Sequence, residues 1–236
     1  MNVAQEFSRF ADQYDSHNQV QRDVAQKLLK RLKKHYTTLV DIGAGSGTLY
    51  RLIAQKGIEF DTFWALDLSE AMLKRHPSHP KVIKKIFNFN QPEAFQELQI
   101  APNATILSSS ALQWASNLDV TLQSMSRHGE RFYLSFFTAN TFATLHKTAN
   151  IHSPIYPTET ILNHLNKYYT LEDYELLSYQ LHFETVRQMF QHIKKSGVSG
   201  GTHQLSYRAI KRLMQEYPLN YLEFEVLLVE ATPKVL

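Results

Sequence analysis

Three glycines at alternate positions, Gly43, Gly45 and Gly47, form the segment whose residue types and spacing are best suited to binding chemistry. They follow the apolar run 38–42, which predicts a β-strand, and apolar residues with helical spacing begin just beyond them. Because glycine has no Cβ, the backbone of such a loop can approach a ligand closely. The start of the following helix adds free N–H groups. Together these features predict a site for a nucleotide-type ligand.

A carboxylate lies where such a site needs one. Asp67 stands 20 residues after Gly47, at the expected end of the next strand, and could accept hydrogen bonds from two ribose hydroxyls. Leu68 and Met72 supply apolar groups that could flank an adenine ring. The combination favours a cofactor site over a plain tight turn.

The spacing of the glycines excludes three familiar motifs. A dinucleotide fingerprint, G-x-G-x-x-G, requires glycine at the position of Thr48. A P-loop requires a lysine after its last glycine, and none follows Gly47. Ser46 does not lie in the G-x-S-x-G pattern of a nucleophile elbow.

The elements that position these residues alternate between strand and helix. Strands are predicted at 38–42, 63–67, 82–87, 105–108, 131–137, 174–183 and 221–232. Helices are predicted just after Gly47 and at 18–35, 70–75, 118–126, 141–148, 158–165, 184–195 and 206–217. This order predicts an α/β fold with a mostly parallel sheet and helices on both faces. We expect a single domain over residues 1–236, with a small helical lid at about 183–217.

The composition fits a folded protein without disulfides. The 236 residues include no cysteine, which excludes disulfides, zinc–thiolate sites and cysteine nucleophiles. Residues 1–10 lack the apolar region of a signal peptide, and no apolar stretch approaches the roughly 20 residues of a membrane helix. We therefore expect a cytoplasmic monomer without membrane contact.

Segments 41–47 and 66–73 resemble the first two motifs of the class I methyltransferases that use S-adenosylmethionine (SAM). The resemblance implies a Rossmann-like, seven-stranded sheet whose C-terminal strand is antiparallel. It also implies SAM as cofactor and S-adenosylhomocysteine (SAH) as product. The cofactor-site residues that it implies are Asp41, Gly43, Ala44, Gly45, Asp67, Leu68, Met72, Asn88, Phe89, Ser109 and Ser110.

Further segments narrow the resemblance. In order along the chain, 7–15, 108–114, 181–183, 194–198, 217–218 and 224–227 are similar to the malonyl-acyl-carrier-protein O-methyltransferases of biotin synthesis, the BioC family. The similarity implies methyl transfer from SAM to the free carboxylate of malonyl-acyl-carrier protein. That carboxylate is ionised at neutral pH, so the reaction requires no general base. Positioning and exclusion of water are expected to supply most of the rate.

Four residues are candidates for positioning the acceptor: Tyr14, Gln113, Trp114 and His146. Tyr14 and Trp114 could equally be core aromatics, and His146 could be a surface residue. An arginine would be expected to bind the malonyl carboxylate with two hydrogen bonds, yet residues 132–186 contain none. Either one of three other residues binds the malonyl carboxylate in place of an arginine of that segment, or the protein acts on a different acid. These residues are Lys147, His152 and Arg187.

The segment 182–217 carries six basic and two acidic residues. Since acyl carrier proteins are acidic, this segment is a candidate docking surface, although a solvated helix face would look the same. The candidate docking residues are Arg187, Lys194, Lys195, Arg208, Lys211 and Arg212.

Two alternatives to this interpretation stay open. One is a methyltransferase for another small acid, of the trans-aconitate type, and the other is a SAM-binding protein without catalysis. Metal binding is not predicted, because Pro77 and Pro80 interrupt the helix that would align His76 with His79. Nucleic-acid binding is not predicted either, because the net charge is only +3.

Overall fold

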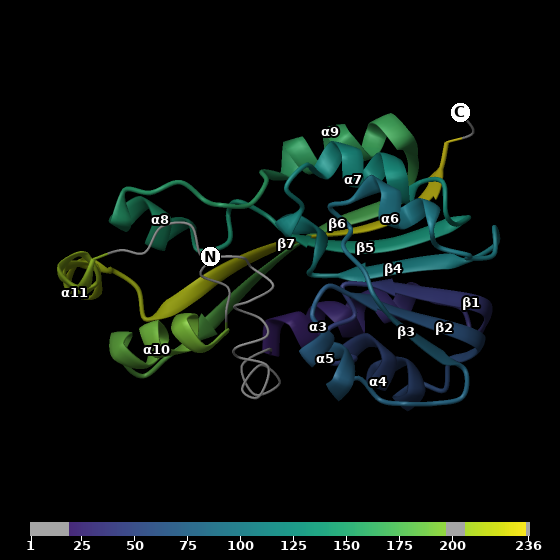
Figure 1. Cartoon of the computed structure of the whole chain (residues 1–236). Helices are drawn as coiled ribbons and strands as arrows, with labels where there is room; N and C mark the ends of the chain where they lie inside the picture. Colours follow the sequence, from purple (N-terminus) through teal and green to yellow (C-terminus); the bar gives the residue numbers. More distant parts are fainter. Residues whose placement is uncertain (1–18, 197–205, 235–236) are drawn as a thin grey trace.

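A sheet of seven strands in the order β3-β2-β1-β4-β5-β7-β6 runs through the described part of the chain (Figure 1). The computed structural model describes residues 19–196 and 206–234, with residues 194–196 and 207 described by their backbone alone. Strand β1 is parallel to β2 and β4, β2 to β3, and β4 to β5. Strand β7 is antiparallel to both β5 and β6. The predicted mostly parallel sheet with an antiparallel C-terminal strand is confirmed.

The elements have the following bounds. The strands are β1 (His35–Ile42), β2 (Glu59–Asp67), β3 (Val82–Ile86), β4 (Thr105–Ser109), β5 (Arg131–Phe137), β6 (Tyr169–His182) and β7 (Tyr221–Pro233). The helices are α3 (Gln19–Leu28), α4 (Thr48–Gln55), α5 (Glu70–Arg75), α6 (Pro92–Gln96), α7 (Leu118–Met125), α8 (Ala143–Ala149), α9 (Thr158–Tyr168), α10 (Val186–Ser196) and α11 (Tyr207–Glu216). Two short 3-10 turns are η1 (Leu29–Arg31) and η2 (Leu112–Trp114).

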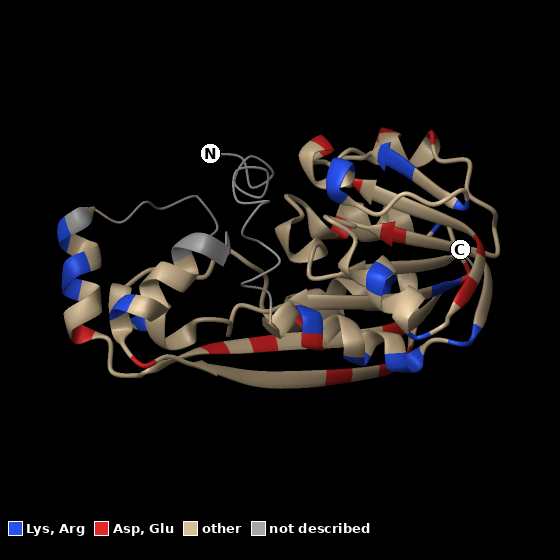
Figure 2. Ribbon diagram, turned by 90° about the horizontal axis from the view of Figure 1, so that it is seen from below, with Lys and Arg blue, Asp and Glu red and all other residues tan. Residues whose placement is uncertain are grey.

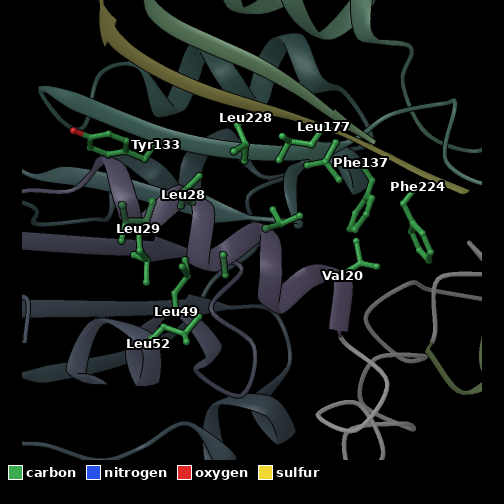
Figure 3. Close-up of a cluster of buried hydrophobic side chains, with 14 of the residues drawn as sticks. Val20, Leu28, Leu29, Leu49, Leu52, Tyr133, Phe137, Leu177, Phe224 and Leu228 are labelled. Carbon is green, nitrogen blue, oxygen red and sulfur yellow. The ribbon is translucent and has the colours of Figure 1, made fainter. Parts of the chain in front are cut away.

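Helices cover both faces of the sheet. Figure 1 shows α3, α4 and α5 on one face and α6, α7 and α9 on the other. Each face has its own apolar core. Figure 3 shows the first core, which includes Val20 and Leu28 of α3 and Leu29 of η1. Tyr133 of β5 and Phe224 of β7 belong to the same core. Helix α3 also contacts α4, β4 and β5, which places it next to the glycine loop that precedes α4.

The first helix is shorter than predicted. The pattern predicted a helix over 18–35, but α3 ends at Leu28 and β1 already begins at His35. The backbone N–H of Lys33 donates to the hydroxyl of Tyr36 at 2.7 Å. His35 pairs with Glu59 of β2, so sheet pairing overrides the helical pattern in its last turn.

Like β1, two further strands begin earlier than predicted, and one helix was missed. Strand β2 begins at Glu59 and β6 at Tyr169, rather than at 63 and 174. In β2, Phe60 is buried between exposed neighbours, the alternation expected of a half-buried strand. Helix α6 spans five residues, with Pro92 in its first turn. That length is too short to show helical periodicity.

The two C-terminal strands extend beyond the rest of the sheet. Figure 1 shows β6 and β7 running out to α10 and α11, with α8 nearby. The Phe183 N–H donates to the Asn220 carbonyl at 2.8 Å, which joins the two strands at that end. Helices α10 and α11 therefore lie in the segment expected to form a lid. Whether that segment closes over a ligand stays a prediction.

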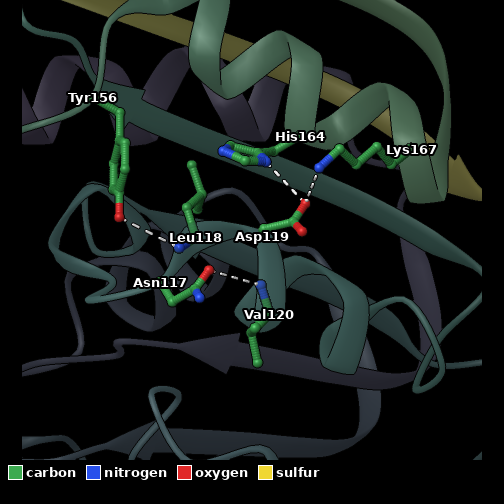
Figure 4. Close-up of polar contacts among 7 residues, drawn as sticks. All are labelled: Asn117, Leu118, Asp119, Val120, Tyr156, His164 and Lys167. Carbon is green, nitrogen blue, oxygen red and sulfur yellow. Dashed lines mark hydrogen bonds and ion pairs between the residues drawn. The ribbon is translucent and has the colours of Figure 1, made fainter.

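A polar joint holds α7 against α9 (Figure 4). One carboxylate oxygen of Asp119 accepts from Nδ1 of His164 at 2.8 Å and from Nζ of Lys167 at 2.9 Å. The hydrogen bond from Lys167, followed by that from His164, lowers the pKa of Asp119. Asn117 begins α7 by accepting from the Val120 N–H at 3.2 Å. These contacts hold α7 and α9 together on the face of the sheet that carries the second core.

Candidate functional site

A cleft opens at the carboxyl ends of β1 and β4. It encloses about 440 Å³, counting its mouth, which is open to solvent. Its lining residues are Gln21, Ala25, Asp41, Gly43, Ala44, Gly45, Ser46, Thr48, Leu49, Ser109 and Ser110. Six of the eleven predicted cofactor residues therefore line this cleft.

The three loop glycines all have positive φ, but their surroundings differ. A Cβ on Gly43 would lie 2.3 Å from the Cβ of Ala111, so this position admits no side chain. A Cβ on Gly45 would meet nothing within 4 Å, and Gly45 lines the cleft. Gly45 therefore presents bare backbone to open space, where a ligand could approach it closely.

Asp67 ties the end of β2 to the glycine loop. One of its oxygens accepts from the Gly45 N–H and the other from the Ser69 N–H, each at 2.8 Å. Burial raises the pKa of Asp67, while these two hydrogen bonds lower it in part. Each carboxylate oxygen keeps a second acceptor position. The carboxylate can therefore hold the loop in place and still accept a ligand hydroxyl.

Asp41 is a buried carboxyl at the end of β1. The residue is 1% exposed, and one oxygen, Oδ1, is buried without a hydrogen-bond partner in the described part of the chain. Burial raises the pKa of Asp41 well above its ordinary value, and the neighbouring Asp67 charge raises it further. An unsatisfied buried oxygen beside the cleft costs stability in the free protein. A ligand donor would satisfy it.

The predicted adenine contacts lie beside Asp67. Ser69 begins α5 by accepting from the Met72 N–H at 3.3 Å, which keeps Met72 buried while Leu68 stays 38% exposed. The Phe87 N–H donates to the Asp67 carbonyl at 2.9 Å. This bond brings the residues that follow β3, Asn88 and Phe89, to the end of β2. Neither Leu68 nor Met72 lines the cleft itself.

The end of β4 supplies polar atoms that lack partners among the described residues. Ser110 has a positive φ of 59°, which is uncommon for a serine. Its hydroxyl is buried without a partner, as is Oε1 of Gln113. Nε2 of Gln113 donates to the Ser110 carbonyl at 2.7 Å. Trp114 is partly buried against the first core. Gln113 is thereby fixed at one end, with its oxygen left to meet a donor.

Two further positioning candidates were predicted, Tyr14 and His146. Tyr14 is outside the described residues. His146 is on α8, which packs against α11, and it does not line the cleft. Its Nδ1 is buried without a partner in the described ranges, and burial lowers the pKa of the ring. A part for His146 in positioning stays a prediction.

Five lining residues were not among the predicted site residues. They are Gln21, Ala25, Ser46, Thr48 and Leu49. Gln21 and Ala25 lie one turn apart on α3, beside the apolar stripe of that helix. The sequence does show that Gln21 is a polar residue at the edge of this stripe. Only the packing of α3 shows that its side chain faces the cleft.

Two kinds of feature are not found within 19–196 and 206–234. No group of three histidine or acidic side chains could hold a metal ion there. No helix of those ranges is long and apolar enough to cross a membrane.

Sequence comparison finds malonyl-[acyl-carrier protein] O-methyltransferases among the relatives of this chain. No family model matches the chain. A malonyl-[acyl-carrier protein] O-methyltransferase of Serratia marcescens is 32% identical over 130 residues, 53% of this chain and 47% of that protein. One from Halalkalibacterium halodurans is 31% identical over 162 residues, 61% of this chain and 58% of that protein. The chain is a sequence relative of these O-methyltransferases. It spans about half the length of the curated relatives it matches.

Structure comparison agrees on the fold. A SAM-dependent methyltransferase from Anabaena variabilis matches with a TM-score of 0.62 and 14% identity, covering 99% of this chain and 96% of that one. At that identity the likeness shows the fold alone. The fold is that of the class I methyltransferases, as predicted.

Proposed function

We propose that this protein is a SAM-dependent O-methyltransferase whose acceptor is the free carboxylate of malonyl-acyl-carrier protein. The observation that carries the cofactor half is the bare backbone of Gly45, which faces the cleft and is held there by Asp67. The acceptor half rests on the sequence relatives, whose names specify that reaction.

The chain offers a matching group for each part of SAM. The acceptor positions left on Asp67 suit the two ribose hydroxyls. The unpartnered oxygens of Asp41 and Gln113 suit the donors of the methionine ammonium group. The exposed side chain of Leu68 suits one face of the adenine, with Asn88 at its edge. Orphaned acceptors around an open glycine loop therefore fit this cofactor.

The chemistry needs positioning more than acid–base catalysis. SAM supplies a methyl group on a positively charged sulfur. A carboxylate oxygen forms a bond to that methyl carbon while the carbon–sulfur bond breaks and its electron pair stays on sulfur, giving a methyl ester and SAH. No proton moves. The tasks left to the chain are to align the carboxylate at about 3 Å from the methyl group and to exclude water. Gln113 and Trp114, beside the end of β4, are the described candidates.

The carrier protein would dock on α10 and α11. Figure 2 shows Lys and Arg on both helices. On α11, Arg208, Lys211 and Arg212 are exposed, while Leu213 is buried. Arg212 pairs with Glu216 at 2.7 Å. Arg187 on α10 is also exposed. An acidic carrier protein would complement this surface electrostatically.

Acceptor choice tests the proposal. The purified chain would be given SAM with a labelled methyl group, together with malonyl-acyl-carrier protein, free malonate or trans-aconitate. We expect more label to be transferred to the carrier-bound malonyl group than to either free acid. Transfer to the free acids alone would point to a small-acid enzyme, and SAH binding without transfer to any of them would point to a binding protein.

A further inference from the structure

His76 is a buried histidine directly beneath the glycine loop. It ends α5 and is 2% exposed. A Cβ on Gly47 would lie 2.7 Å from Cδ2 of His76 and 3.0 Å from its Nε2. The ring is therefore in close contact with the last glycine of the loop, which is the N-cap residue of α4. The shape of the loop at Gly47 depends on what occupies this position.

The surroundings of the ring favour its neutral form. Nδ1 lies 2.9 Å from the Pro77 carbonyl, to which it can donate. Nε2 is buried and has no hydrogen-bond partner in the described part of the chain. The ring packs against Tyr50 and Phe63, with centroids 5.2 and 6.0 Å away. A proton on Nε2 would place a positive charge in this setting without an acceptor, which is unfavourable.

Within the described part of the chain, the charged groups that face the ring are two cations. They are Arg51 on α4 and Lys84 on β3, whose Nζ donates to the backbone carbonyl of His76. Tyr50 on α4 is the other titratable neighbour. Burial lowers the pKa of His76, and the charges of Lys84 and Arg51 lower it further.

Arg51, whose charge acts on this ring, also binds the glycine loop. Its guanidinium donates to the Ser46 carbonyl at 2.7 Å and to the Ser46 hydroxyl at 3.3 Å. Ser46 lines the cleft and directly precedes Gly47. A charge on His76 would therefore repel the side chain that fastens the loop.

We propose that His76 is a positioning residue for the glycine loop, and that it supports the binding shape of the loop only while its imidazole is neutral. Acidification would then loosen the loop and weaken cofactor binding. The second consequence rests on the proposed function, because it assumes that SAM and SAH bind at this loop. The first does not, because it concerns the ligand-free chain.

The ligand-free test uses nuclear magnetic resonance on the wild-type chain. The ring resonances of His76 and the amide resonances of Gly45 and Gly47 would be followed between about pH 7.5 and 5. The two amides are expected to shift with the titration midpoint of the His76 ring. Amides that stay in place while the ring titrates would overturn the proposal, whatever the protein binds.

The ligand test uses calorimetry with SAH at about pH 7.5 and 5.5. One proton coupled to binding changes affinity up to about tenfold per pH unit, so wild-type affinity should fall about three- to tenfold or more. His76→Phe and His76→Gln cannot be protonated and should lose that part of the fall. His79→Phe, at an exposed position, should keep it. Equal pH profiles in all four proteins would refute the role of His76. No SAH binding at pH 7.5 would instead count against the proposed function.

Discussion

Replacing Gly45 by alanine should separate the stability of the glycine loop from its binding. Gly45 has φ +54° and no atom within 4 Å of the point where a Cβ would lie, while Gly57, at the end of α4, has φ +64° and equally open surroundings. The two substitutions therefore impose the same backbone cost. Only Gly45 lines the cleft. Gly57→Ala is thus a matched control for Gly45→Ala.

The size of both effects follows from this geometry. An alanine in the left-handed region costs about 1–2 kcal/mol, which lowers the melting temperature by roughly 2–8 °C in a chain of this size. Both variants should show that loss. A methyl group forced against a ligand costs about 1–3 kcal/mol more, which corresponds to roughly 5- to 150-fold weaker binding. Only Gly45→Ala should show that second loss.

Thermal unfolding of the ligand-free proteins and calorimetry with SAH measure the two effects. The two variants are expected to melt at the same temperature, below that of the wild type. Only Gly45→Ala is expected to bind SAH more weakly. If both variants bound SAH as the wild type does, no ligand would lie against Gly45. If Gly45→Ala were far less stable than Gly57→Ala, the space beside Gly45 would not be open.

Three further substitutions test other parts of the structure. Asp41→Asn should stabilise the ligand-free chain at neutral pH by about 0.5–2 kcal/mol; because the pKa of Asp41 is raised, the gain should grow as pH rises above its ordinary value of 3.8, as followed by thermal unfolding. Asp119→Asn should lower the free energy of unfolding by less than about 1 kcal/mol. Because the pKa of Asp119 is lowered, the stability that its carboxylate contributes should be present above about pH 4 and fade as pH falls further. The same contribution should shrink in high salt. Lys211→Glu should weaken turnover of malonyl-acyl-carrier protein and leave SAH affinity unchanged. The control variant Lys56→Glu, changed at an exposed position at the end of α4, should turn over this substrate as fast as the wild type does. Equal turnover by the two variants would argue against docking on α11.

The sheet and the glycine loop were predictable because their signals are local. The apolar run before Gly43, the glycine spacing and Asp67 lie within about 30 residues of one another. Alternation of strands and helices then implies parallel pairing, with all the loop residues at one edge. The strand starts were less predictable, because pairing partners decide them. His35 joins β1 through Glu59, which no local pattern indicates.

Contacts between distant segments could not be predicted. The turn after β5 is an example: Oε1 of Glu225 on β7 accepts from Thr138 and Asn140, and from Thr158 at the start of α9. Gln21 reaches the cleft only because α3 packs below the sheet. His76 touches Gly47 only because α5 ends beneath the loop. In each case the contact depends on how separate elements pack against one another, which spacing in the sequence does not indicate.

The most direct test of the proposed reaction is the intact mass of malonyl-acyl-carrier protein after incubation with SAM and this protein. A gain of one methyl group is predicted. Mild alkali should release that methyl group as methanol, because a methyl ester hydrolyses, and an acetyl-loaded carrier that lacks the free carboxylate should gain no methyl group. An unchanged mass, or a methyl group that resists alkali, would contradict carboxylate methylation.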